Sequence, residues 1–186
     1  AGNFTRATDG DALTAVFNTK CASLGDWDDD GDLDLFTGNN QGQKNRLYEN
    51  DGNGVFTDTA HPDLTEDRGE TNDSEWADMD NDGRLDLVLV NAPGLAGFLA
   101  DVNLIYYNDG NGRFDRPTFG PLIEDRNYSF QLGLGDTDGD GNLDMLVANN
   151  NEGNSGYYNR GRQWVNLEES LAGGSGTPLQ GATGNL

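Results

Sequence analysis

The sequence has little cysteine, little histidine and few basic residues. Cys21 is the single cysteine among 186 residues, so no disulfide forms within the chain, and its apolar neighbours favour a small buried side chain. Only 11 Lys and Arg stand against 33 Asp and Glu, which gives a formal net charge of −22. Nucleic acids and anionic membrane surfaces need basic residues opposite their phosphates, so both are excluded as partners. No apolar run reaches the length of a transmembrane helix, so we also expect no membrane insertion.

Motifs for catalysis are scarce too. The single histidine, His61, lies in a polar stretch beside Pro62, and we expect it on the surface rather than in the role of a general base. The sequence holds no nucleophile elbow and no phosphate-binding glycine loop. A glycosidase would need a carboxylate pair, but 14 of the 33 carboxylates fall in the acidic segments described next. We therefore expect that the chain is not an enzyme.

Three acidic segments share the skeleton Asp-x-Asp-x-Asp-Gly-x-x-Asp. They run from Asp26 to Leu35, from Asp78 to Leu87 and from Asp136 to Met145. Carboxylates at positions 1, 3, 5 and 9, with a sharp turn at the Gly of position 6, suit Ca²⁺, which binds several oxygen ligands at once. A charge run is usually a solvated turn, but a spacing that recurs three times indicates three calcium sites.

A second pattern repeats around the acidic segments. Phe4, Phe56 and Phe114 each precede an acidic segment by 22 residues, and Asn-x-x-Tyr-x-Asn follows each segment. Each unit offers four short strands: one into the acidic loop, one out of it, the Tyr strand, and the strand that starts at the Phe. Strands into the loop are expected at 21–25, 74–77 and 130–135, and strands out of it at 33–37, 85–90 and 143–148. Apolar residues on both phases of 85–90 predict a strand buried on both faces.

Short strands, 27 glycines and no helical periodicity make the predicted fold all-β. Four strands per unit at this period are typical of a β-propeller blade. The predicted repeats cover approximately residues 2–53, 54–111 and 112–160, with 161–186 as the start of a fourth. This gives three four-stranded antiparallel blades and an orphan strand at each end. We expect a segment of a larger propeller, completed by blades of the same longer chain or of another subunit.

Other calcium-binding families share the opening of these loops but fit poorly. An EF-hand needs a Glu at position 12 and flanking helices, whereas this chain has Thr37, Leu89 and Val147 there. Thrombospondin type 3 arrays pack their loops closely and carry many cysteines. The nine-residue loop between strands, the Asn-x-x-Tyr-x-Asn strand and the Gly-x-Phe-Thr-Asp strand start instead resemble the FG-GAP/VCBS repeat of β-propellers. The run from Asn45 to Asp58 is most similar to the VCBS branch, found in cartilage acidic protein and bacterial relatives.

The resemblance implies a ligand set for each of three Ca²⁺ ions. The family uses the side chains of loop positions 1, 3, 5 and 9 and the backbone carbonyl of position 7. In this sequence the implied ligands are Asp26, Asp28, Asp30, the Asp32 carbonyl and Asp34; Asp78, Asp80, Asp82, the Arg84 carbonyl and Asp86; and Asp136, Asp138, Asp140, the Asn142 carbonyl and Asp144.

The predicted function is an extracellular, calcium-stabilised scaffold, secreted or at the cell surface, for protein binding or adhesion. A lectin-like alternative would use the polar loops 39–43, 91–102 and 149–154 to bind a glycan. Two further alternatives are the non-catalytic propeller of a polysaccharide-degrading enzyme and a structural repeat of an extracellular assembly. Sequons for N-glycosylation occur at Asn3, Asn72 and Asn127.

Overall fold

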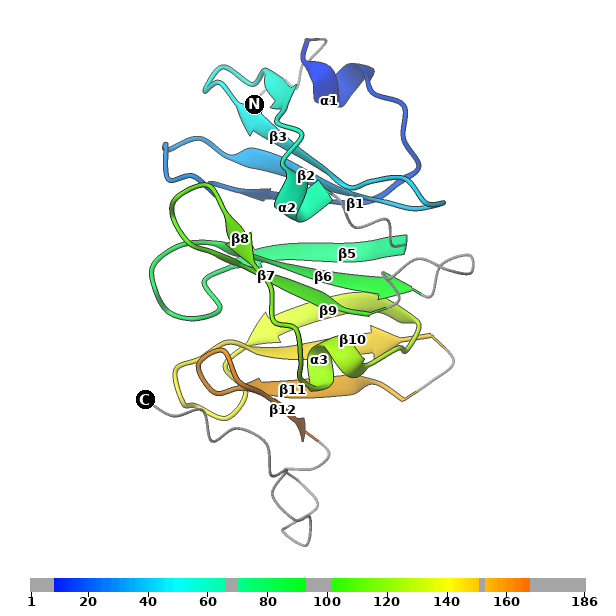
Figure 1. Ribbon diagram of the computed structural model, residues 1–186, viewed down its shortest axis with the longest axis vertical. Helices are drawn as coiled ribbons and strands as arrows, with labels where there is room; N and C mark the ends of the chain where they lie inside the picture. The colour runs from blue at the N-terminus through cyan, green and yellow to red at the C-terminus, as the bar shows by residue number, and fades with distance from the viewer. Residues whose placement is uncertain (1–8, 66–69, 93–101, 151–152, 168–186) are drawn as a thin grey trace, which may run out of the picture.

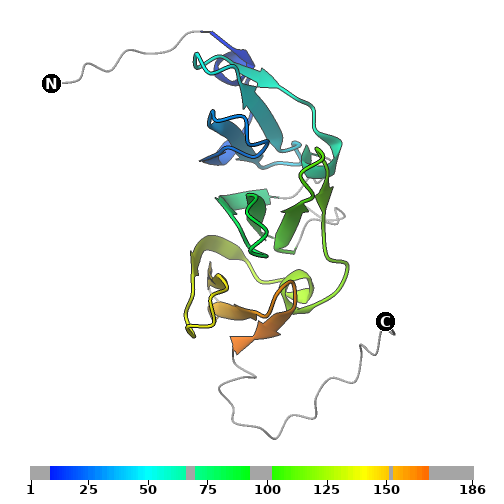
Figure 2. The same ribbon diagram turned by 90° about the vertical axis from the view of Figure 1, so that its left-hand side faces the viewer.

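Three four-stranded antiparallel sheets follow one another along the long axis of the molecule (Figures 1 and 2). This arrangement is seen in a computed structural model, which describes residues 9–65, 70–92, 102–150 and 153–167. In each sheet the strands lie in the order in which they occur in the sequence. The predicted all-β, propeller-blade architecture is confirmed.

The strands of each blade have the following bounds. The first blade comprises β1 (Thr19–Gly25), β2 (Asp34–Asn39), β3 (Arg46–Asn50) and β4 (Phe56–Asp58). The second comprises β5 (Glu70–Ala77), β6 (Asp86–Ala92), β7 (Leu104–Asn108) and β8 (Phe114–Asp115). The third comprises β9 (Ser129–Gly135), β10 (Asp144–Asn149), β11 (Ser155–Asn159) and β12 (Trp164–Asn166). The strand that follows residue 53 pairs back onto the Tyr strand, so each sheet ends one strand later than the corresponding sequence repeat. The predicted orphan strands, at Phe4 and near the C-terminus, lie outside the described residues.

One-turn helices occur where the sequence predicted none. They are α1 (Asp11–Thr14), α2 (Pro62–Thr65) and α3 (Pro121–Glu124). A single turn is too short to show a 3.6-residue periodicity, so the hydrophobic pattern gave no sign of it. The second and third begin with Pro, which is well suited to the first turn of a helix. Helix α2 buries Leu64 and helix α3 buries Leu122 in the apolar clusters between the blades.

The core lies between the blades. Strand β6 is buried along its whole length, as predicted: Leu87 and Leu89 belong to the apolar cluster shared with the first blade, and Val88 and Val90 to the cluster shared with the third. Alternate side chains of a strand point to opposite faces of a sheet, so the middle blade joins the two clusters. This packing aligns the three blades and therefore the loops that connect their first two strands.

Candidate metal centre

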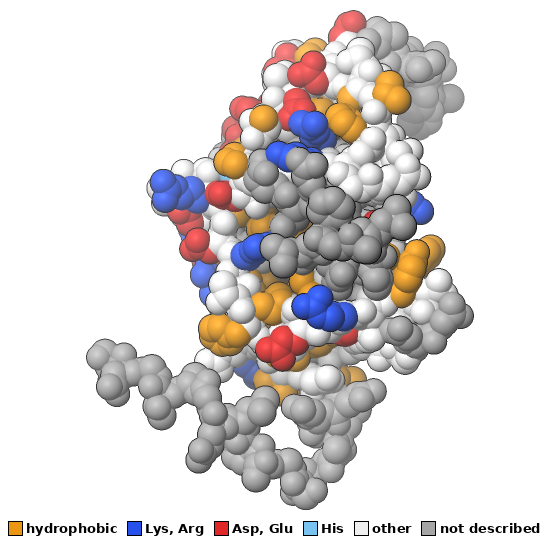
Figure 3. Space-filling view, turned by 45° about the vertical axis from the view of Figure 1, so that its right-hand side comes forward, with side chains coloured by type: hydrophobic (Ala, Val, Ile, Leu, Met, Phe, Trp, Pro, Cys, Tyr) orange, Lys and Arg blue, Asp and Glu red, His pale blue; other side chains and the backbone are white. Residues whose placement is uncertain are grey.

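The three acidic loops project from the same edge of the stack of sheets. Each connects the first strand of a blade to the second, between β1 and β2, β5 and β6, or β9 and β10 (Figure 1). The space-filling view of Figure 3 turns this edge away from the viewer and shows acidic side chains, with basic ones among them, along the left outline of the molecule. The loops are referred to below as loops 1, 2 and 3.

Three carboxylates converge in each loop. In every case they are those of positions 1, 3 and 9, and one oxygen from each lies within 4.8 Å of the others. The groups are Asp26, Asp28 and Asp34 in loop 1; Asp78, Asp80 and Asp86 in loop 2; and Asp136, Asp138 and Asp144 in loop 3. Such all-oxygen donor sets fit a hard cation, and the fit recurs in three loops of different sequence.

Backbone amides hold the first carboxylate of each loop in place. In loop 1 the amides of Asp30 and Gly31 donate to the two oxygens of Asp26, at 3.1 and 3.0 Å. The equivalent bonds measure 3.0 and 2.9 Å in loop 2 and 3.2 and 3.1 Å in loop 3. The turn requires a positive φ at position 6, which is 97° at Gly31, and glycine adopts this conformation without the strain of a side chain.

The remaining predicted ligands lie outside these three-carboxylate groups. The position 5 carboxylates, Asp30, Asp82 and Asp140, each accept the backbone amide of position 7, at 3.0, 3.0 and 2.9 Å. The position 7 carbonyls, those of Asp32, Arg84 and Asn142, stay predicted ligands. The side chains at position 7 differ between the loops and make different contacts. In loop 2, for example, Arg84 Nε donates a hydrogen bond to the Asn108 carbonyl.

The carboxylate of position 9 is the buried member of each group. Asp34 and Asp86 are fully buried, and Asp144 is 1% exposed. Burial raises the pKa of Asp34 and that of Asp86 to about 6, against the opposing effect of the backbone amides that they accept. A buried carboxylate that ionises needs a compensating positive charge or hydrogen-bond donors.

Asp34 lacks one of these donors. Its Oδ1 accepts the Asn50 amide at 2.9 Å, but its Oδ2 has no hydrogen-bond partner. The Trp27 amide is near enough to lower the pKa of Asp34, yet it makes no hydrogen bond of normal geometry. A buried carboxylate oxygen without a donor, on a residue that belongs to a group of three carboxylates, is where a cation would be most stabilising.

The last Asn of the Asn-x-x-Tyr-x-Asn pattern supports the buried carboxylate, a role that the sequence did not reveal. The backbone amides of Asn50, Asn108 and Asn159 donate to Oδ1 of Asp34, Asp86 and Asp144, at 2.9, 2.8 and 3.0 Å. Their side-chain amides donate to the carbonyl of loop position 8, at 3.0, 3.3 and 3.2 Å. The only signal in the sequence was the fixed spacing of this Asn from the Tyr, which marked the strand but predicted no contact with the acidic loop.

Arginines reach into loops 2 and 3. Arg160 bridges Asp138 and Asp140 within loop 3. Arg162, from the third blade, donates through Nε to Asp80 of loop 2 at 2.6 Å, and its guanidinium lies 4.4 Å from the centre of the Tyr107 ring. These guanidinium groups offset part of the negative charge of the two loops.

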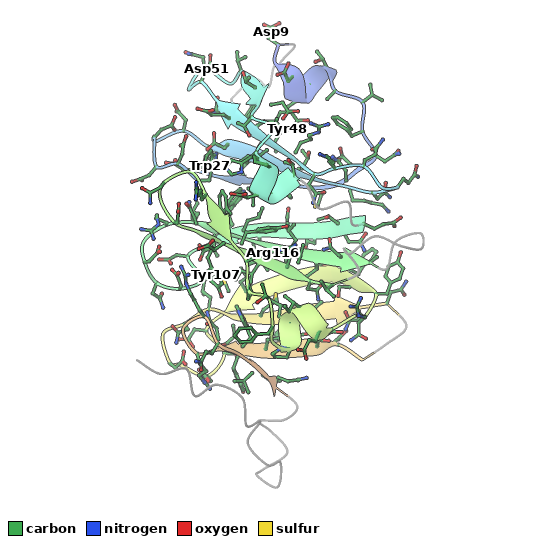
Figure 4. The ribbon with its side chains drawn as sticks, viewed as in Figure 1. Asp9, Trp27, Tyr48, Asp51, Tyr107 and Arg116 are labelled. Atoms are coloured by element: carbon green, nitrogen blue, oxygen red, sulfur yellow. The ribbon has the colours of Figure 1, made fainter. Side chains whose placement is uncertain are left out.

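His61 was expected on the surface and Cys21 in the interior, and both are half-buried. His61 is half-buried, not on the surface: its ring packs edge-on against Trp27 and Phe114, with centroids 5.5 and 5.4 Å away. Trp27 lies between the first two sheets (Figure 4), so aromatic neighbours from two blades cover the histidine. Cys21 is half-buried, lies 3.5 Å from Ser74 Oγ, and has a raised pKa because of its burial.

The polar loops proposed for a glycan begin with asparagines that serve the fold. The side chains of Asn39, Asn91 and Asn149 donate to the carbonyls of Lys44, Val102 and Gly153, at 2.8, 2.7 and 2.8 Å, and so close their own loops. Residues 93–101 and 151–152 of these loops lie outside the described residues. Of the sequon asparagines, Asn3 also lies outside them, whereas Asn72 donates to the Ser129 carbonyl and Asn127 to Ser155 Oγ.

Comparison with known families agrees with this geometry. Residues 2–89 match the model of the FG-GAP-like repeat, and no curated protein matches the chain. The third blade lies beyond the matched range and has the same strand order and the same three-carboxylate loop as the first two. None of the helices in the described part of the chain has the length and apolar character needed to cross a bilayer. Residues 2–89 therefore belong to the FG-GAP-like repeat family, whose repeats form β-propeller-type scaffolds.

Proposed function

We propose that the three acidic loops bind Ca²⁺ and that the cation-stabilised blades form an extracellular scaffold for a protein ligand. The observation that carries the calcium proposal is the buried Oδ2 of Asp34, which has no donor and belongs to a group of three carboxylates. Catalysis plays no part in this proposal, because repeats of this family are generally non-catalytic.

Calcium fits the donor set better than a softer metal. Every side chain in the three groups is a carboxylate, and hard cations prefer oxygen, whereas zinc sites usually include Cys or His. In each blade the ligands come from both sides of a turn, since position 1 directly follows one strand and position 9 begins the next. A cation that binds both positions therefore ties the first two strands of the blade together.

The cation also relieves repulsion between carboxylates. Two carboxylates about 4 Å apart repel by roughly 1 kcal/mol in water and by about 4 kcal/mol at an effective dielectric constant near 20. Each loop brings three carboxylates together, and the only positive side chains described beside them above are the arginines at loops 2 and 3. We therefore assign the calcium a structural role.

Thermal unfolding with and without calcium tests this proposal. We expect millimolar Ca²⁺ to raise the melting temperature, EGTA to lower it again, and calorimetric titration to give three bound ions per chain. Asp28→Asn should reduce the stoichiometry or the affinity, whereas Asp115→Asn removes the same charge from an exposed position outside the loops and should change neither. A melting temperature that is the same in EGTA and in calcium would refute the calcium proposal.

The family and the calcium chemistry support the proposed extracellular location. FG-GAP repeats are typically extracellular, and extracellular modules bind Ca²⁺ with dissociation constants of about 10⁻⁴ to 10⁻³ M, which suits a calcium-rich medium. Protease treatment of intact cells tests the location, because an extracellular protein is degraded without lysis and an internal one is protected. We favour a protein ligand over a glycan because the leading asparagines of the polar loops are committed to the fold. Binding to a glycan array in millimolar calcium would reverse that preference.

A further inference from the structure

Asn159 connects two calcium loops through buried hydrogen bonds. Its backbone amide donates to Asp144 of loop 3 at 3.0 Å, and its side-chain Nδ2 donates to the Met79 carbonyl of loop 2 at 2.6 Å. Asn159 and Met79 are both fully buried. One residue of the third blade therefore contacts a candidate ligand of its own loop and the backbone of the neighbouring loop.

Met79 completes the connection at the other end. It lies between Asp78 and Asp80 in the sequence, and its own amide donates to Oδ2 of Asp86 at 2.9 Å. A continuous path of hydrogen bonds thus runs from Asp144 through Asn159 and Met79 to Asp86. It joins the buried carboxylates of loops 3 and 2.

The path between loops 2 and 1 starts in the same way but stays open. The Asn108 amide donates to Asp86 at 2.8 Å, and its Nδ2 donates to the Trp27 carbonyl of loop 1 at 2.7 Å. The Trp27 amide, however, makes no hydrogen bond of normal geometry with Asp34, whose Oδ2 is unpaired. The structure therefore has one complete path and one incomplete path.

We propose that Asn159 is a positioning residue that makes calcium binding at loops 2 and 3 cooperative; this inference rests on the proposed calcium function. A cation held by Asp78, Asp80 and Asp86 fixes the backbone at Met79, and the Met79 carbonyl then fixes Asn159 against Asp144. Loop 3 is then already ordered when its own cation binds, so the loop loses less conformational entropy in that step. Coupling of this kind acts equally in both directions.

Exposed contacts between the same two loops serve as an internal comparison. Asn81 donates to Asn142 Oδ1 at 2.8 Å from a solvent-exposed position. Water competes for such a bond, so we expect it to carry little coupling. Asn81→Gly removes it without strain, because φ at Asn81 is 61° and loop 3 has Gly139 in the same position.

The test is a calcium titration followed by NMR, with one glycine amide as the reporter of each loop. Gly31, Gly83 and Gly141 occupy position 6, and each donates to the first carboxylate of its loop. Asp78→Asn serves to disable loop 2. We expect it to raise the calcium midpoint at Gly141 by at least about fivefold, in the range of ordinary coupling between sites.

Asn159→Ala should remove most of this dependence while keeping the backbone bond to Asp144. In that background the effect of Asp78→Asn at Gly141 should fall to less than about twofold, whereas Asn81→Gly should leave it unchanged. Undiminished coupling in Asn159→Ala overturns the proposal. If that variant does not fold, Asp78→Asn alone decides: a larger shift at Gly141 than at Gly31 supports the proposal, and equal shifts overturn it.

The same titration separates this inference from the calcium proposal. Glycine resonances that do not respond to calcium in the unaltered protein would refute the proposed function itself. Resonances that respond with midpoints independent of Asp78→Asn would refute only the coupling through Asn159.

Discussion

Replacing Asp34 by Asn should have opposite effects on stability with and without calcium. The carboxylate of Asp34 is fully buried, and its Oδ1 accepts the Asn50 amide while its Oδ2 has no partner. In Asp34→Asn the amide oxygen keeps the bond to Asn50. The new NH₂ group takes the place of the unpaired oxygen, at a residue whose carboxylate is grouped with those of Asp26 and Asp28. The variant removes a buried charge and loses no hydrogen bond.

The expected gain without calcium follows from the pKa. A pKa of about 6, raised from 3.8 by burial, corresponds to an ionisation cost of about 3 kcal/mol at neutral pH. The loop is open to solvent on one side, and screening reduces this to about 1–2 kcal/mol. For a chain of this size the melting temperature in EGTA should then rise by about 2–8 °C. In calcium the variant lacks a charged ligand, so its melting temperature should fall below that of the unaltered protein.

Circular dichroism melts in EGTA and in millimolar CaCl₂ measure both effects. Asp86→Asn is the matched control, because both oxygens of Asp86 accept amides, from Asn108 at 2.8 Å and from Met79 at 2.9 Å. Its NH₂ group would meet one of those N–H groups, so this variant should not be stabilised in EGTA. If Asp34→Asn lowers the melting temperature equally under both conditions, the reasoning from the unpaired oxygen is wrong.

Three further predictions concern pH, the arginines and the blade interface. In EGTA the free energy of unfolding should increase as the pH falls from 7 towards 5. Burial raises the pKa values of Asp34 and Asp86 to about 6, so these groups stabilise the fold fully below their unfolded pKa and lose that effect as the pH rises through 6. Urea titrations in EGTA that show the opposite slope with pH would contradict this prediction. Arg160→Gln should lower the calcium midpoint of loop 3 in the NMR titration, because the guanidinium that bridges two of its carboxylates no longer competes; an unchanged or higher midpoint contradicts competition. Gly25→Ala should lower the free energy of unfolding in urea by about 1–3 kcal/mol, because the new Cβ would lie 2.6 Å from the indole of Trp76 in the next blade. Gly135→Ala, at the equivalent position of the third blade, meets no atom within 4 Å and should be nearly neutral. Equal losses of stability in the two variants would show that the close approach at Gly25 is relieved by movement.

The parts of the fold that the sequence predicted are those encoded by spacing within one unit. The strands around each acidic loop were predicted correctly to within a few residues, because the loop positions and the apolar strands are adjacent in the chain. The three-carboxylate groups follow from the same local spacing. The one-turn helices were missed because four residues hold no periodic pattern. The position of His61 was missed because its aromatic neighbours, Trp27 and Phe114, are distant in the sequence.

The sequence by itself thus determined the blade, its acidic loop and the oxygen chemistry of that loop. Only the tertiary structure decided how the loops differ and how they are connected. The bonds from Asn108 to Trp27 and from Asn159 to Met79 join residues 81 and 80 positions apart. The repeat pattern does not encode such a pair. It fixes the position of each partner within its own repeat, and that position would be the same whether or not the next blade packed against it. The alignment of neighbouring blades brings the asparagine to the loop carbonyl. It also leaves Asp34 with an unpaired oxygen where Asp86 has two donors.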